Sequence, residues 1–158
     1  MYLFTAPSPQ RDGDLDAEVY IHEMTHGLSN RLIGNAAGLN NTRGGGMGEG
    51  WGDFYGRMLL SSADEDVNAV YAMGSYVTLN FQTVGTNNYY YGIRRFPYAV
   101  KTNVGTNGLP HNPQTLADID PAQINNTDGA FPKSTWVSNT ATEVHNEGEI
   151  WCMMLLEV

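Results

Sequence analysis

The pentapeptide His22-Glu23-Met24-Thr25-His26 constrains the fold of this chain more than any other feature. In an α-helix, side chains four residues apart lie on one face, one turn apart. A helix through this segment would direct both imidazoles to one zinc ion, at about 2.1 Å each. Glu23 would lie at the flank of the pair, where a carboxylate can take a proton from a water at the metal. A chance match is the alternative, and the helical surroundings argue against it.

We expect this helix to span residues 14–30. Asp14 and Asp16 favour its N-terminus, because acidic groups interact well with that end of the helix dipole. Apolar residues recur at spacings of three and four and predict a buried stripe opposite the two histidines. The members of this stripe are Ala17, Ile21, Met24 and Leu28.

Glu49 is the best candidate for a third metal ligand, in a glycine-rich segment where Asp53 follows one helical turn later. Asp53 would accept the second ring N–H of a ligand histidine and so fix its orientation. Two acids on a solvated helix face are the alternative. Each glycine costs a helix about 1 kcal/mol relative to alanine. Gly52 and Gly56 therefore favour the metal site, since they let this helix approach the histidine helix closely.

His145 is a further catalytic candidate, because a histidine near the cleft can donate to the oxyanion that forms at an attacked carbonyl. Taken alone, it is a polar residue at the start of a helix. His111 has the setting of a loop histidine without a role.

Two further sets of residues each allow two interpretations. The acidic run before the histidine helix either binds Ca²⁺ through its oxygens, although it lacks the EF-hand spacing, or compensates the helix dipole, and its members are Asp12, Asp14, Asp16 and Glu18. The Tyr89–Tyr91 run and the pair Arg94 and Arg95 are interpreted as packing and surface groups, although one arginine could instead hold a substrate carbonyl.

The remaining sequence predicts a mainly α fold with long irregular loops in one domain over residues 1–158. Further helices are expected at 47–62, 65–82 and 146–157, and residues 83–140 are rich in turn signals. Loops of this length in a compact domain indicate a functional role. Cys152 lies in an apolar run and is expected to be a buried, unreactive thiol.

The net charge of −9 argues against nucleic acid and anionic membrane surfaces as partners. No apolar stretch approaches the 18 residues that a membrane-spanning helix needs, and no leader segment is apparent. A soluble protein is therefore expected.

The chain resembles the fungalysins, secreted fungal zinc endopeptidases with a site plan like that of the thermolysin-like enzymes. The resemblance is carried by two segments, DGDLDAEVYIHEMTHGLSNRL and GGGMGEGWGDF. It extends through GIRRFPY, HNPQTLADID and EVHNEGEIW, and so covers nearly the whole chain.

This resemblance implies a thermolysin-like zincin catalytic domain, built around the HExxH helix and a second helix with the glutamate ligand. It implies one zinc ion held by His22, His26 and Glu49, with Glu23 as general base. By looser analogy, His145 stabilises the transition state and Asp53 supports a ligand histidine. The implied protein is secreted as a zymogen and cleaves polypeptides.

Two departures from the family pattern stand out. The signal peptide, propeptide and N-terminal β-rich domain that family members possess are not found in this chain, so we expect a truncated catalytic domain. Residues 27–48 also lack the tyrosine that thermolysin-like enzymes place between the second histidine and the glutamate ligand. A non-catalytic zinc-binding module is therefore kept as the alternative function.

Overall fold

The computed structural model of this chain describes residues 3–4, 9–78, 91–100, 112, 114–119 and 143–158. Its helices are α1 (Ala17–Leu32), α2 (Thr42–Leu60), α3 (Ser75–Thr78) and α5 (Val144–Leu156), with short 3-10 helices at Gly13–Leu15, Gly34–Ala36 and Leu116–Ile119. The strands β1 (Leu3–Phe4) and β2 (Arg11–Asp12) pair antiparallel. The prediction of a mainly helical fold is confirmed.

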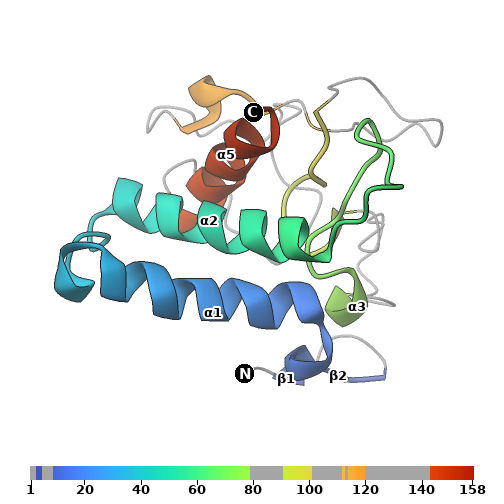
Figure 1. The fold of residues 1–158 in the computed structure, drawn as a ribbon, viewed down its shortest axis with the longest axis horizontal. Coiled ribbons are helices and arrows are strands. Elements are labelled where there is room, and N and C mark those ends of the chain that lie inside the picture. The colour runs from blue at the N-terminus through green and yellow to red at the C-terminus, as the bar shows by residue number, and fades with distance from the viewer. Residues whose placement is uncertain (1–2, 5–8, 79–90, 101–111, 113, 120–142) are drawn as a thin grey trace.

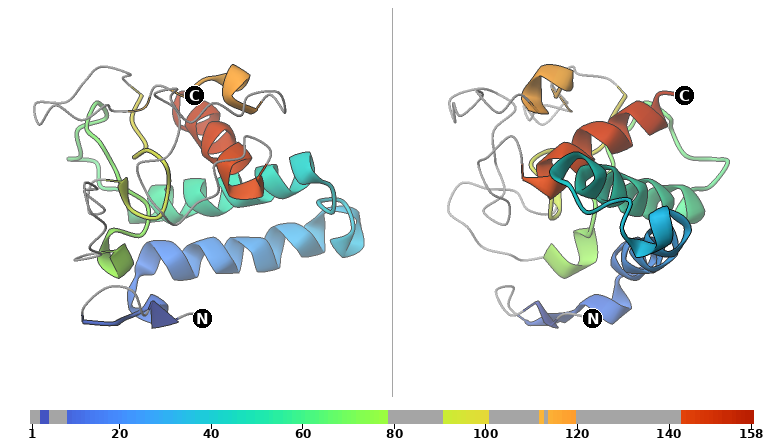
Figure 2. Two further views of the ribbon diagram at one scale, coloured as in Figure 1. Left: turned by 180° about the vertical axis from the view of Figure 1, so that it is seen from behind. Right: turned by 90° about the vertical axis from the view of Figure 1, so that its left-hand side faces the viewer.

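Helix α2 lies between the two other long helices. Helix α1 runs antiparallel along one side of α2, and α5 crosses its other side (Figure 1), an arrangement that the two further views in Figure 2 also show. Side chains from three separate parts of the sequence therefore meet around α2.

Polar caps determine where the long helices begin. Asp16 caps α1 by accepting a hydrogen bond from the Glu18 N–H at 3.1 Å, and its second oxygen accepts one from the Val77 N–H at 3.2 Å. Asn41 caps α2 through the Gly44 N–H at 2.8 Å. This cap starts α2 five residues before the predicted position.

The predicted third helix at 65–82 is wrong over its described part. Only the single turn of α3, Ser75–Thr78, is helical between residues 65 and 78. The Asp66 side chain accepts a hydrogen bond from the Asn68 N–H at 2.9 Å, and Tyr71 forms a β-bridge with Tyr98. These local and long-range hydrogen bonds compete with helix formation.

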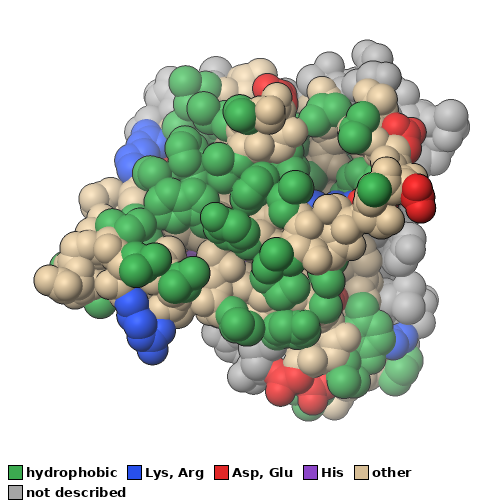
Figure 3. Space-filling view, in the orientation of Figure 1, with side chains coloured by type: hydrophobic (Ala, Val, Ile, Leu, Met, Phe, Trp, Pro, Cys, Tyr) green, Lys and Arg blue, Asp and Glu red, His purple; other side chains and the backbone are tan. Residues whose placement is uncertain are grey.

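The predicted apolar stripe of α1 is not buried, and this prediction is wrong. Met24 is 68% exposed and Leu28 is 58% exposed, whereas Ala17 and Ile21 are partly exposed. The buried side of α1 faces α2 and includes His22. Polar groups can occupy that interface because they are paired there. Figure 3 shows hydrophobic side chains gathered on one exposed face of the molecule, over α1 and α2.

Helices α2 and α5 pack so closely that only glycine fits at their crossing. A Cβ atom at Gly148 would lie 2.5 Å from the Cβ of Glu49. This contact holds α5 against the part of α2 that carries the candidate ligand.

The hydrophobic core lies beside this crossing. Its buried cluster consists of Met73, Tyr98, Cys152 and Met153. Cys152 is fully buried, as predicted. None of the helices in the described ranges is both long and apolar enough to cross a membrane.

Candidate metal centre

Helices α1 and α2 bring three potential metal ligands together. Nitrogen atoms of His22 and His26 and a carboxylate oxygen of Glu49 lie within 4.8 Å of one another. The Nε2 atoms of the two histidines are 2.9 Å apart, and Glu49 approaches them at 3.1 Å and 3.4 Å. Within the described part of the chain, this is the one group of three such residues with metal-binding geometry.

Asp53 orients His22. The Nδ1 atom of His22 lies 2.7 Å from Oδ1 of Asp53, and an ionised carboxylate only accepts hydrogen bonds, so Nδ1–H is the donor. The Nε2 atom of His22 is then left to face His26 and Glu49. Burial opposes the charged imidazole, but the carboxylates of Asp53 and Glu49 outweigh it and raise the pKa of His22 to about 9.

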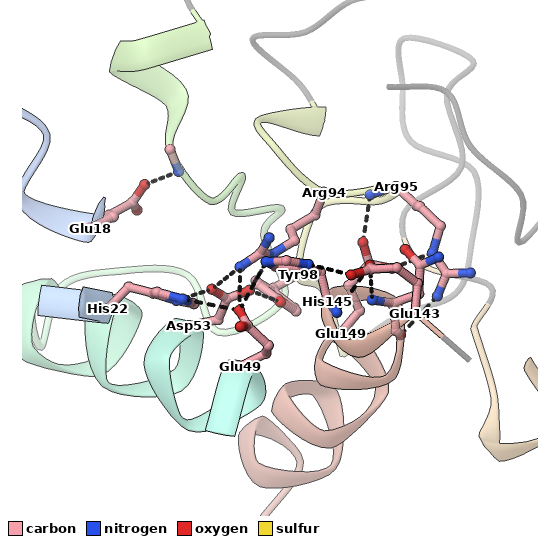
Figure 4. Close-up of polar contacts among 12 residues, drawn as sticks. Glu18, His22, Glu49, Asp53, Arg94, Arg95, Tyr98, Glu143, His145 and Glu149 are labelled. Carbon is pink, nitrogen blue, oxygen red and sulfur yellow. Dashed lines mark hydrogen bonds and ion pairs between the residues drawn. The ribbon is translucent and has the colours of Figure 1, made fainter. Parts of the chain in front are cut away.

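Asp53 is in turn held by two residues from the segment at 91–100. The Arg94 guanidinium donates to both of its oxygens, from Nε at 2.6 Å and Nη2 at 2.7 Å, and the Tyr98 hydroxyl donates as well. Burial disfavours the charged carboxylate, yet Arg94 and His22 keep the pKa of Asp53 below its usual value. Figure 4 shows this chain of contacts from Arg94 to His22.

The three groups fit a metal ion chemically. Oε2 of Glu49 is buried and accepts no hydrogen bond from the residues that the structure describes, although Nε2 of His22 is close. Two imidazole nitrogens and one carboxylate are the donor set that zinc favours. Lone pairs so close together repel one another unless a cation or protons lie between them. The residues present therefore suit a divalent cation.

The side chain of Glu23 lies beside His22 and has no hydrogen-bond partner among the described residues. It helps to line a cavity of about 140 Å³ beside the histidines. The other lining residues are Val19, His22, Met73, Ile93, Arg94 and His145. A carboxylate without a partner in such a cavity is available for proton transfer.

His145, in the first turn of α5, faces the same site. Its Nε2 atom lies 3.5 Å from Oε2 of Glu49, and its Nδ1 atom lies 2.6 Å from Oε1 of Glu143. Burial raises the pKa of the Glu143 carboxyl, but the hydrogen bond from His145 outweighs it and lowers the pKa overall. The structure thus brings His145 to the candidate ligands.

Arg94 and Arg95 are not surface groups. Arg94 is 4% exposed, and Arg95 is fully buried in an ion pair with Glu149, with Nε 2.7 Å from Oε2. The sequence-based interpretation missed Arg94 as the partner of Asp53, and it also missed Tyr98 and Glu143. One signal was present: an arginine pair between apolar residues in a chain with only eight basic residues.

The acidic run before α1 serves the backbone. Asp12 accepts a hydrogen bond from the Asp14 N–H at 3.0 Å, Asp16 caps α1, and Glu18 accepts one from the Gly74 N–H at 2.7 Å. Of these contacts, only that of Asp16 lies at the N-terminus of α1, and nothing in the described structure supports the calcium alternative. His111, Tyr89 and Tyr90 lie outside the described residues.

Known proteins resemble this chain over its whole length. The sequence profile of the fungalysin metallopeptidases (M36) matches residues 1–158. The chain is 38% identical to extracellular metalloproteinase 2 of Trichophyton rubrum and to probable extracellular metalloproteinase 2 of Arthroderma benhamiae. It is 36% identical to extracellular metalloproteinase MEP of Pyricularia oryzae. Each match covers 100% of this chain and 20% of the relative, so the chain spans one fifth of the length of these proteins. The chain belongs to the fungalysin family of metallopeptidases.

Proposed function

We propose that this chain carries the catalytic centre of a zinc-dependent endopeptidase of the thermolysin-like type. The observation that carries the proposal is the convergence of His22, His26 and Glu49 beside the carboxylate of Glu23, which has no partner within the described part of the chain. In a cluster of ion pairs that only stabilises the fold, we would expect the Glu23 carboxylate to have a charged partner.

In this proposal, His22 and His26 would hold zinc through their Nε2 atoms, and Glu49 would hold it through its carboxylate. Bound zinc supplies a Lewis acid, which makes water nucleophilic near neutral pH and polarises the scissile carbonyl. Asp53 keeps the Nδ1 proton on His22, so that Nε2 presents its lone pair to the ion.

Glu23 is the proposed general base. Its carboxylate takes a proton from the attacking water and then gives that proton to the leaving amine nitrogen as the peptide bond breaks. As an imidazolium, protonated on both ring nitrogens, His145 donates from Nε2 to the oxygen of the attacked carbonyl as negative charge develops there, while Glu143 accepts the Nδ1–H. No covalent bond between enzyme and substrate is needed.

The cavity beside Glu23 suits a substrate side chain. Apolar groups of Val19, Met73 and Ile93 form part of its lining, and Arg94 and His145 add polar groups. An apolar residue next to the scissile bond would displace water from this lining. Arg94 lines the cavity while it holds Asp53, and it is the arginine that we propose as the contact for a substrate carbonyl.

The substrate class and location follow from the same proposal. Relatives are named extracellular metalloproteinases, so we propose polypeptide substrates and secretion. Because the chain spans one fifth of these relatives, the propeptide and N-terminal region of the longer protein are proposed partners of this segment.

Metal analysis together with casein hydrolysis, with and without a chelator, tests the proposal. We expect one zinc per chain and cleavage that the chelator abolishes. Glu23→Gln should retain zinc and lose hydrolysis, whereas Glu157→Gln at the exposed end of α5 should alter neither. Full cleavage by the Glu23→Gln variant would remove Glu23 from its role.

A non-catalytic zinc-binding module is the second candidate, because the chain spans only one fifth of the relatives. This alternative predicts one zinc per chain without hydrolysis by the wild-type protein. Zinc content and casein hydrolysis, measured together, distinguish the two candidate functions.

A further inference from the structure

We infer that Glu143 is a positioning residue that holds the imidazole of His145 toward the metal centre. The inference rests on the proposed role of His145 in peptide hydrolysis. It is based on the carboxylate of Glu143, which contacts both the backbone of the first turn of α5 and the imidazole ring of His145.

The two oxygens of Glu143 have separate partners. Oε2 accepts hydrogen bonds from the backbone N–H groups of His145 at 3.1 Å and Asn146 at 3.3 Å, and so caps α5. Oε1 lies 2.6 Å from Nδ1 of His145. Helix capping needs only one side-chain oxygen. The second contact therefore goes beyond what the start of the helix requires.

This second contact determines which edge of the ring faces Glu49. An ionised carboxylate only accepts hydrogen bonds, so Nδ1 of His145 is the donor to Glu143. The opposite nitrogen, Nε2, then points to Oε2 of Glu49 at 3.5 Å. Figure 4 shows His145 between these two carboxylates. Without Glu143, the ring of this half-exposed side chain would be free to rotate away from the site.

The first turn of α5 is itself fixed against α2. A Cβ atom at Gly45 would lie 2.9 Å from Cγ1 of Val144, and one at Gly46 would lie 2.6 Å from the Cβ of Glu147. Because the backbone around His145 packs directly on the helix that carries Glu49, Glu143 fixes the ring relative to the ligand helix. The geometry makes one side chain responsible for both the helix start and the ring orientation.

Glu143→Asp separates these two roles. Aspartate is an excellent N-cap residue, so α5 should keep its stability. Its side chain is one methylene shorter, so we expect it to keep the backbone cap and to lose the contact with Nδ1 of His145. Glu147→Asp is the matched control: it shortens another carboxylate in the same turn, whose partner is Arg43 rather than the ring.

Casein hydrolysis is measured for the wild type, Glu143→Asp, His145→Ala and the double variant. We expect Glu143→Asp to lower kcat about tenfold, with KM, zinc content and Tm unchanged. It should cause no further loss in the His145→Ala background. An equal loss in both backgrounds, or wild-type kcat in Glu143→Asp, would overturn the inference.

Nitrogen-15 NMR of the His145 ring gives a readout that does not depend on hydrolysis. In the neutral ring, the proton should lie on Nδ1 in the wild type and in Glu147→Asp, and this preference should be lost in Glu143→Asp. If the wild type cleaves no casein, the proposed function fails, while the NMR result still decides whether Glu143 positions the ring. The same tautomer in the wild type and in Glu143→Asp would refute that role.

Discussion

The guanidinium of Arg94 binds both carboxylate oxygens of Asp53, while Oδ1 of Asp53 also accepts the Nδ1–H of His22 at 2.7 Å. One buried carboxylate thus joins a segment 41 residues away in sequence to the candidate metal ligand. The stability of the fold and the orientation of His22 depend on the same group.

We expect Arg94→Ala to lower the free energy of unfolding by about 3–5 kcal/mol, because it removes the guanidinium that bonds both oxygens of the buried Asp53 carboxylate. Urea denaturation of the metal-free protein measures this loss. Arg31→Ala on the exposed side of α1 is the control and should cost less than about 0.5 kcal/mol. A cost below about 1 kcal/mol for Arg94→Ala would contradict the importance of this pair.

Gly52→Ala should weaken zinc binding at least tenfold. A Cβ atom at position 52 would lie 2.4 Å from Nδ1 of His22, at the point where that nitrogen meets Asp53. The ring must move, and overpacking of this kind costs about 1–3 kcal/mol. Competition with a zinc-binding dye measures the affinity.

Gly27→Ala in α1 is the matched control for Gly52→Ala. Its Cβ atom would meet only the flexible end of Arg31, at 3.2 Å. Zinc affinity should stay the same, and the gain in helix propensity should add up to about 1 kcal/mol of stability. If both variants bound zinc as the wild type does, the close approach of α2 to His22 would not matter for the site.

Glu18→Gln should remove a pH-dependent loss of stability. Burial outweighs the hydrogen bond from the Gly74 N–H and raises the pKa of Glu18 from 4.5 to about 7. Between these values the unfolded chain releases a proton that the folded chain retains, so wild-type stability falls as the pH rises. The fall is on the order of 2–3 kcal/mol and ends near pH 7.

Urea denaturation at pH 4.5, 6 and 8, in the presence of a chelator, measures the effect of Glu18. The variant should be the more stable protein at pH 8, and the difference from the wild type should shrink at pH 4.5. Glu157→Gln is the exposed control and should follow the wild type. A constant difference between Glu18→Gln and the wild type at all three pH values would contradict the raised pKa.

The parts of the site that sequence could predict are those fixed by local geometry. His22 and His26 meet because four residues nearly complete a helical turn. The glycines around Glu49 indicated a close helix contact, and the structure places Gly52 directly on His22. Both predictions depend on spacing within one helix or on the size of a side chain.

Other features depended on contacts that spacing does not reveal. Arg94 reaches Asp53 from an irregular segment, so its partner becomes visible only in the fold. The apolar residues Met24 and Leu28 are exposed, whereas the candidate ligand His22 lies on the buried side of α1. Hydrophobic periodicity assumes that the buried face is apolar, and the candidate metal centre between α1 and α2 does not meet that assumption.

Zinc should stabilise the folded chain if the three groups bind it together. A ligand that binds only the folded state adds about 2.7 kcal/mol at a free concentration of 100 Kd, which raises Tm by roughly 5–10 °C for a protein of this size. The shift should vanish in His26→Ala, which removes one candidate ligand but leaves the contact between His22 and Asp53. His145→Ala should keep the shift, because His145 contacts Glu49 without belonging to the group of three.

Thermal melts of the wild type, His26→Ala and His145→Ala, with Zn²⁺ and with Mg²⁺ as the hard-cation control, test whether the stabilisation arises at this site. An equal shift with Mg²⁺, or one that persists in His26→Ala, would show that stabilisation arises elsewhere than at His22, His26 and Glu49.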